Sequence, residues 1–175
     1  MVAVRRHYES VAQAIAAPLE FNPGKPNPPL VVLPVQRWSL VAAKALRFAL
    51  NISPDVRAVH IECAESDLLV KEWQDHVARP ARESGLQAPV LAVIESPYRF
   101  VITPILTFIL DLERQNPGRT VAVVIPELVE SRWYHYMLHN QRAYLLKALV
   151  LMKGTGRIVV ANVPWYLDQK QRGDS

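Results

Sequence analysis

The sequence has one cysteine, six glycines and no long uninterrupted hydrophobic run, and each scarcity excludes a class of protein. A single thiol, Cys63, excludes an intramolecular disulfide framework and a zinc site built from several thiolates. The longest apolar stretch, residues 100–110, is interrupted by Pro104 and is far shorter than the roughly 20 residues that cross a bilayer. We therefore expect a domain that lies outside the membrane, in a reducing compartment.

Motifs that bind phosphate or build a nucleophile are also missing. The sequence contains no GxGxxG, no GxxxxGK[ST] and no GxSxG segment. Ser96 is followed by Pro97, which has no amide to offer an oxyanion. His135 and His139 are spaced by one helical turn, but no carboxylate lies between them to complete a metal site. We expect a protein that is not an enzyme and that holds no metal and no cofactor.

The composition is that of a folded domain, with an uneven distribution of charge. Half of the 175 residues are hydrophobic and 21% are charged, so a chain of this length should bury about 70% of its unfolded surface. Residues 131–175 carry seven basic and two acidic side chains, whereas residues 29–130 carry ten basic and twelve acidic ones. A basic C-terminal third suits phosphate, an anionic lipid surface or an acidic partner, and a merely solvated face would look the same.

Five short hydrophobic runs predict the strands of a parallel sheet. They are residues 30–35, 56–61, 90–94, 121–125 and 157–163. Each run is rich in β-branched residues and is continuous rather than alternating, which is typical of strands covered on both faces. Helical stretches are expected between them at residues 39–50, 65–79, 100–115 and 131–153. The sequence thus predicts an α/β fold with a helix after each of the first four strands.

Turn and cap residues set the expected boundaries. Ser39 is a suitable N-cap, Asn116-Pro117-Gly118 should stop a helix, and Gly154-Thr155-Gly156 should form a helix end and turn before the last strand. Residues 3–17 have helical spacing and precede a proline-rich stretch, which predicts an amphipathic connector helix. The expected organisation is a connector over 1–29, an α/β domain over 30–169 and a tail over 170–175.

Ligands of open parallel sheets bind beyond the carboxyl ends of the strands, so the residues there are candidates for a site. Arg37-Trp38 follows the first predicted strand, and Tyr98-Arg99 follows the third. Arginine can fork onto phosphate oxygens and an aromatic ring can stack on a base. The predicted ligand-binding residues are Arg37, Trp38, Tyr98, Arg99, His139, Asn140 and Gln141. The alternative is that the rings pack the sheet edge while the arginines are solvated.

Several short motifs occur in an order that resembles a known family. They are Arg5-Arg6-His7-Tyr8, Leu33-Pro34-Val35, Lys44-Ala45-Leu46-Arg47-Phe48-Ala49, Ser96-Pro97-Tyr98-Arg99, Val124-Ile125-Pro126-Glu127, Leu138-His139-Asn140-Gln141 and Val163-Pro164-Trp165. With these motifs the chain resembles the cytosolic C-terminal domain of permeases of the APC superfamily. That branch includes the proton-coupled potassium importers of bacteria as well as amino-acid permeases.

The resemblance implies a fold similar to universal stress proteins, with five parallel strands in the order 3-2-1-4-5 and helices on both faces. It implies a regulatory domain on the cytoplasmic side of the cell membrane, joined to the transmembrane transport domain of the same parent chain. In the potassium importers such a domain is a dimeric receptor for cyclic di-AMP. Pro126-Glu127 stands where ATP-binding relatives have a glycine-rich loop, which argues against ATP.

The apolar stretch over residues 100–115 offers more hydrophobic surface than one face of a sheet covers, so this helix or the edge of the fifth strand is expected to form a homodimer. A fully buried helix would have the same composition. Three other functions stay open. The chain could be a purely structural dimerisation module without a ligand, a small hydrolase, or a nucleic-acid binder that uses its basic C-terminal third.

Overall fold

The computed structural model describes residues 27–62, 66–96, 101–129 and 141–166. The predicted connector helix over residues 3–17 and the tail over 170–175 lie outside these ranges, as do Cys63, His135 and His139. No helix within the described ranges is long and apolar enough to cross a membrane.

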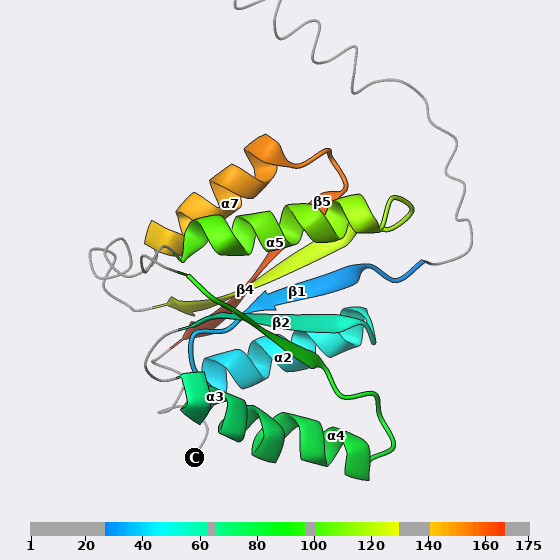
Figure 1. The fold of residues 1–175 in the computed structure, drawn as a ribbon, viewed down its shortest axis with the longest axis vertical. Coiled ribbons are helices and arrows are strands. Elements are labelled where there is room, and N and C mark those ends of the chain that lie inside the picture. The colour runs from blue at the N-terminus through cyan, green and yellow to red at the C-terminus, as the bar shows by residue number, and fades with distance from the viewer. Residues whose placement is uncertain (1–26, 63–65, 97–100, 130–140, 167–175) are drawn as a thin grey trace, which may run out of the picture.

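The described residues form the predicted parallel sheet (Figure 1). Its strands are β1 (Leu30–Pro34), β2 (Val56–Ile61), β3 (Val90–Ile94), β4 (Val121–Val129) and β5 (Ile158–Tyr166). All neighbouring strands pair in parallel, and their order in the sheet is β3-β2-β1-β4-β5. The order 3-2-1-4-5 that the family resemblance implies is confirmed.

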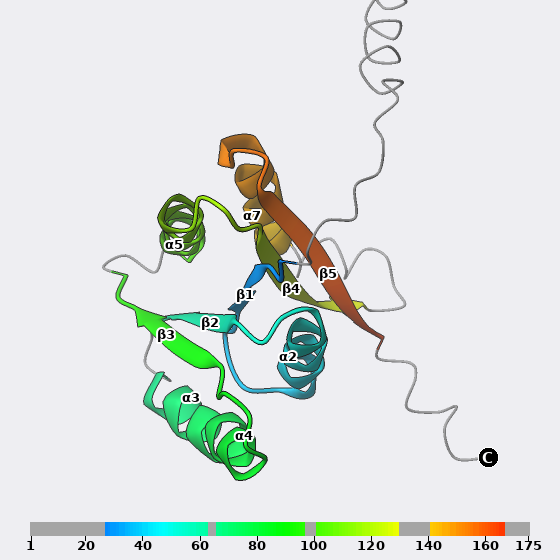
Figure 2. The same cartoon turned by 90° about the vertical axis from the view of Figure 1, so that its right-hand side faces the viewer.

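Helices cover both faces of the sheet, as Figures 1 and 2 show. They are α2 (Leu40–Ile52), α3 (Ser66–Trp73), the π-helical turn η1 (Gln74–Ala78), α4 (Arg79–Glu83), α5 (Ile102–Gln115) and α7 (Gln141–Lys153). Helices α2, α3 and α4 lie on one face, and α5 and α7 lie on the other. This arrangement confirms the two-sided α/β architecture.

Successive residues of β1 belong to two different cores, which explains its unbroken hydrophobicity. Val31 and Leu33 are buried with the apolar side chains of α2 and α3. Leu30 and Val32 are buried with those of α5 and α7. A strand alternates its side chains between the two faces, so a central strand covered by helices on both sides needs an apolar residue at every position.

The start of α2 and the ends of α5 and α7 are where the sequence predicts them. The Ser39 hydroxyl accepts a hydrogen bond from the Ala42 amide at 3.2 Å and caps α2. Helix α5 stops before Asn116, and Gly154 follows α7 with its amide donating to the Val150 carbonyl at 2.9 Å. Gly156 then adopts a φ of +85°, which glycine tolerates without steric cost. The predicted caps and turn are confirmed.

A proline explains the widened helical turn between α3 and α4. Pro80 has no N–H to donate, and its ring would collide with the carbonyl four residues earlier in a regular α-helix. In η1 the Arg79 amide donates instead to the Gln74 carbonyl, five residues back. The widened turn accommodates the proline, and the helical segment therefore continues to Glu83 rather than ending at the predicted Arg79.

Helix α5 leaves less exposed apolar surface than its composition suggests. Ile105, Leu106 and Ile109 are buried, and Ile102, Phe108 and Leu110 are half-buried. Both the sheet and α7 contact this helix. Large exposed apolar side chains occur instead on α2, α3, β3, α7 and β5.

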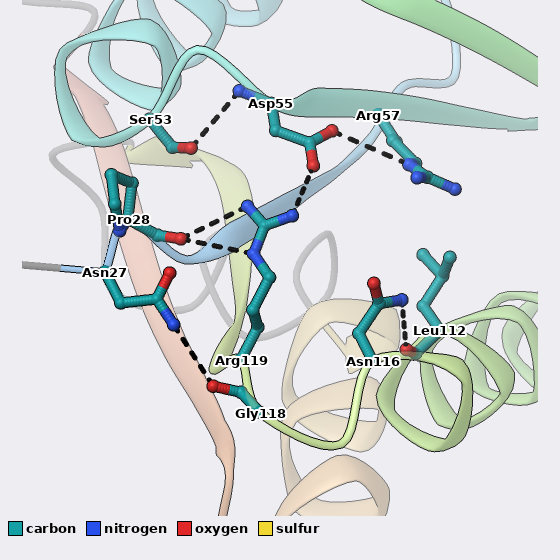
Figure 3. A network of polar contacts seen from close by, with 9 residues as sticks. All are labelled: Asn27, Pro28, Ser53, Asp55, Arg57, Leu112, Asn116, Gly118 and Arg119. Atoms are coloured by element: carbon teal, nitrogen blue, oxygen red, sulfur yellow. Dashed lines mark hydrogen bonds and ion pairs between the residues drawn. The ribbon is translucent and has the colours of Figure 1, made fainter.

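We call the edge of the sheet at which its strands begin the amino edge. Arg119 connects the segments that precede three strands at this edge (Figure 3). Arg119 precedes β4, and its Nη1 donates to Asp55 Oδ2 at 2.7 Å, just before β2 begins. Its Nη2 donates to the Pro28 carbonyl at 3.1 Å, just before β1. Asn27 Nδ2 also donates to the Gly118 carbonyl at 3.1 Å. The segment that leads into β1 is thereby fixed to the neighbouring strands.

A second polar cluster at the amino edge surrounds a buried carboxylate. Glu113 of α5 is 1% exposed, and its Oε1 accepts hydrogen bonds from the amide and the hydroxyl of Thr155. Arg157 Nε lies 3.9 Å from the same oxygen, and its Nη1 donates to the Asn116 carbonyl at 3.3 Å. These contacts fix the turn between α7 and β5 to the end of α5.

Candidate functional site

We call the edge of the sheet at which its strands end the carboxyl edge. At this edge β1 and β4 separate. Pairing of β1 with β4 stops at Val32↔Val123. Pairing of β1 with β2 continues to Pro34↔Val59, and β4 stays paired with β5 as far as Val129↔Tyr166. The strand order also reverses between β1 and β4, and ligands of open α/β sheets bind at that position.

The long β4–β5 ladder corrects the predicted ends of these two strands. Pro126 and Glu127 were expected to follow the fourth strand, and Pro164, Trp165 and Tyr166 were expected to follow the fifth, but all five are paired strand residues. The sequence prediction ended each strand at its first proline, because proline removes one hydrogen bond from a ladder.

The backbone pattern explains why β4 tolerates Pro126. The Leu30 amide donates to the Thr120 carbonyl, whereas the Val121 amide donates to the Arg157 carbonyl. Alternation along β4 therefore directs the backbone groups of its even-numbered residues toward β1. Pro126 is even-numbered and lies beyond the last β1 pair, so its nitrogen faces the side where no described strand pairs with β4.

The loop after β1 places a cation and an aromatic ring at the divided carboxyl edge. Arg37 is exposed, and no carboxylate in the described ranges pairs with it. Trp38 is half-buried and contacts Trp73 of α3 edge-to-face, with ring centroids 5.7 Å apart and planes at 84°. The Trp73 indole is itself fixed by donation to the Pro89 carbonyl at 3.2 Å. Trp38 is thus a positioned side chain, while the guanidinium of Arg37 is available to an anion.

Most other predicted site residues lie outside the described ranges. Tyr98, Arg99, His139 and Asn140 are among them, and Gln141 is described only as the first residue of α7. Because β3 ends at Ile94 and α5 begins at Ile102, the described flanks of the Tyr98-Arg99 segment lie at the carboxyl edge. The convergence of these side chains with Arg37 and Trp38 stays a prediction.

Sequence reasoning missed a polar pair on β4 and β5 at the same edge. Asn162 Nδ2 donates to Oε2 of the buried Glu127 at 3.0 Å. Glu127 has the same parity as Ile125, so both side chains project toward the face that α5 and α7 cover. A predicted strand that ended at Ile125 could not place Glu127 inside the ladder. The signal available was a carboxylate flanked by apolar residues in Val124–Val129.

A buried histidine links the end of β1 to the start of α3. His60 of β2 is 2% exposed, with Nδ1 2.9 Å from the Val35 carbonyl and Nε2 3.0 Å from the Ser66 hydroxyl. Ser66 and His60 are in contact like a nucleophile and its base, but both side chains are buried. Their arrangement stabilises the strand end rather than presenting a hydroxyl to solvent. Within the described ranges no group of three or more His, Cys, Asp or Glu could hold a metal ion.

Lysine 44 joins α2 to the carboxyl end of β5. Its Nζ donates to the Pro164 carbonyl at 2.9 Å and lies 5.4 Å from the centroid of the Trp165 ring. Both partners are uncharged, so the contact orients the lysine without neutralising it. The carboxyl edge therefore carries two cationic side chains, Arg37 and Lys44, that no described carboxylate pairs with.

Comparison with known proteins gives two matches. A family model described as the KimA potassium transporter C-terminal domain matches residues 26–165. The potassium transporter KimA of Bacillus subtilis (strain 168) is 25% identical over 168 residues, which cover 94% of this chain and 26% of that transporter. The chain thus spans about a quarter of the length of this relative.

Proposed function

The chain belongs to the family of KimA potassium transporter C-terminal domains, and we propose that it is a regulatory domain that binds a cyclic dinucleotide such as cyclic di-AMP and forms a homodimer. Its partner would be the transmembrane part of the same parent chain, on the cytoplasmic side of the membrane. The observation that carries the nucleotide proposal is the division of the sheet between β1 and β4, with an uncompensated arginine beside it.

The chemistry of this edge suits a nucleotide phosphate. Arg37 is exposed without a carboxylate partner in the described ranges, and a guanidinium can donate two parallel hydrogen bonds to a phosphate. Beyond Val123, β4 directs backbone groups toward a side on which β1 no longer pairs. A ligand with phosphates and flat purine rings would use the cation and an aromatic wall together.

Calorimetric titration of the 175-residue chain with cyclic di-AMP tests this proposal. Arg37→Ala should weaken binding at least tenfold, because it removes a charge-assisted contact with the phosphate. Arg82→Ala is the matched control: this arginine is exposed on α4, and its removal should leave the affinity unchanged. Absence of heat with cyclic di-AMP, AMP and ATP would reject the receptor and leave a purely structural dimerisation module.

The β5 edge supports the proposed homodimer. Strand β5 is the last in the sheet, so one side of its nine-residue backbone has no neighbour among the described strands. Val159 on β5 is 53% exposed, and Met152 on the adjacent α7 is 81% exposed. A long edge strand with apolar neighbours is a surface on which a second copy can pair.

Sedimentation equilibrium distinguishes the two edges of the sheet. Val159→Lys should convert the dimer to a monomer, because it places a charge on the proposed interface. Val90→Lys on β3, the opposite edge, changes a valine of similar exposure (56%) and should leave the dimer intact. A wild-type chain that stays monomeric at high concentration, or equal effects of both substitutions, would contradict the proposed interface.

The proposal excludes a catalytic role for the polar residues of the carboxyl edge. Ser66 and His60 are buried, and Glu127 is hydrogen-bonded to Asn162 in the strand ladder. None of these groups is an exposed nucleophile with a base and an anion hole around it. We therefore propose a domain that binds its ligand without transforming it.

A further inference from the structure

One face of α2 combines exposed cations with exposed apolar side chains. Viewed along the helix, Leu40, Lys44 and Arg47 start from the side opposite the buried residues of α2, and Phe48 and Leu50 flank them on either side. All five residues are exposed, with Leu40 at 68% and Phe48 at 40%. We call these five residues the α2 outer face.

All the charged side chains of the α2 outer face are cationic. Helix α2 contains no Asp or Glu from Leu40 to Ile52. Lys44 contacts only the uncharged Pro164 carbonyl and Trp165 ring, and no carboxylate in the described part of the chain pairs with Arg47. By contrast, one exposed arginine on each of two other helices is paired, Arg79 with Asp75 at 2.6 Å and Arg114 with Asp111 at 2.6 Å. The charge of the α2 outer face is left for an external anion.

The position of α2 brings this face near the point where the upstream chain joins the domain. Helix α2 runs back from the carboxyl edge to the amino edge and ends at Ile52 (Figure 1). Asp55 follows directly, and Arg119 connects Asp55 to Pro28, where the chain enters β1 (Figure 3). In a transporter of this family the membrane part would precede that point, which keeps the domain, and the α2 outer face with it, within reach of the bilayer.

We propose that the α2 outer face binds anionic phospholipid headgroups at the membrane surface. Lys44 and Arg47 would contact lipid phosphates, and the flanking Phe48 and Leu50 would enter the interfacial layer. Trp165 lies beside Lys44, and tryptophan favours the membrane interface because its ring is apolar and its N–H is polar. An acidic protein surface would pair with the cations but would not explain why the apolar Leu40 and Phe48 are exposed beside them.

Co-sedimentation of the full 175-residue chain with vesicles tests the proposal. The chain should bind vesicles that contain phosphatidylglycerol, should bind pure phosphatidylcholine vesicles much less, and should dissociate as the salt concentration rises. Each cation near an anionic surface contributes about 1 kcal/mol, or roughly fivefold in binding. The double variant K44Q/R47Q should therefore bind phosphatidylglycerol vesicles about 30-fold more weakly.

The matched control is K71Q/R82Q, which removes two exposed cations from α3 and α4 on the same face of the sheet. It should weaken vesicle binding less than threefold. Arg47→Gln alone removes no described contact within the protein, so a roughly fivefold loss in this variant is independent of any effect on folding.

Three results would overturn the proposal. The first is equal weakening by K44Q/R47Q and K71Q/R82Q, which would make binding a matter of net charge. The second is equal binding to both lipids, and the third is binding to neither. The result does not depend on the nucleotide titration, since the vesicles contain no nucleotide and Arg37 is retained in every variant.

Discussion

The arginines at the two edges of the sheet differ in whether they contact acceptors within the described part of the domain. At the amino edge, Arg119 reaches Asp55 and the Pro28 carbonyl, and Arg157 reaches Glu113 and the Asn116 carbonyl. At the carboxyl edge, Arg37 is exposed without a carboxylate in the described ranges, and the strands part beside it. The difference indicates that the amino edge stabilises the fold, whereas the carboxyl edge keeps charge available for a ligand.

Removing the buried carboxylate of the amino edge should have the largest effect. Glu113→Ala leaves the Thr155 amide and hydroxyl without their acceptor and removes the carboxylate that faces the Arg157 guanidinium. Breaking a buried polar cluster of this kind should lower the free energy of unfolding by about 3 kcal/mol, measured by urea denaturation. The control is Arg114→Ala, which removes an exposed ion pair and a long exposed hydrogen bond to the Leu110 carbonyl and should lower the free energy of unfolding by less than ~1 kcal/mol. Equal losses of stability in Glu113→Ala and Arg114→Ala would show that the buried cluster contributes no more than the surface ion pair.

A smaller loss is expected where the arginine is partly exposed. Arg119→Ala removes an ion pair and two hydrogen bonds to Pro28, but the side chain is 29% exposed, so solvent screens part of the interaction. Stability should fall by about 1–2 kcal/mol. The Nε of Arg57 lies 3.7 Å from the carboxylate of Asp55. Arg57→Ala should change the free energy of unfolding by less than ~0.5 kcal/mol. If Arg119→Ala left the free energy of unfolding unchanged, this contact would not fix the segment that leads into β1.

Substitution at the carboxyl edge should leave stability almost unchanged. Arg37 makes no ion pair within the described ranges, so Arg37→Ala should alter the free energy of unfolding by less than ~0.5 kcal/mol in the same urea titration. A loss comparable to that of Arg119→Ala would show that Arg37 serves the fold, and the contrast between the edges would fail.

Much of the fold could be predicted from sequence because its signals are local. Five continuous apolar runs mark strands covered on both faces, and Ser39, Asn116 and Gly154 mark helix ends at the observed places. The strand order was implied by the family resemblance, which the family match confirms, rather than by the strands themselves. Hydrophobic pattern alone does not order parallel strands, because each one reads as buried on both faces.

The ends of β4 and β5 could not be predicted, because they depend on what lies beside each strand. Pro126 is acceptable in β4 only because β1 stops pairing at Val32, and that fact is tertiary. The hydrogen bond between Asn162 and Glu127 was missed for the same reason. Likewise, the composition of α5 suggested a surface for a partner, but packing against the sheet and α7 covers most of it.

Of the candidate site, sequence reasoning identified Arg37 and Trp38 from their position after a strand. It could not show that Trp38 rests against Trp73, because the two indoles lie 35 positions apart in the chain. The predicted contributions of Tyr98, Arg99, His139, Asn140 and Gln141 remain predictions. The nucleotide titration of the Arg37→Ala variant examines the part of the site that the structure describes.

The joint between the sheet and the chain before it has a mechanical consequence. Pro28 and Pro29 restrict their own backbone torsions, and hydrogen bonds from Asn27 and to Pro28 secure this stretch to the residues that precede β4. The backbone at Asn27 and Pro28 is therefore held in a fixed position relative to the start of β4.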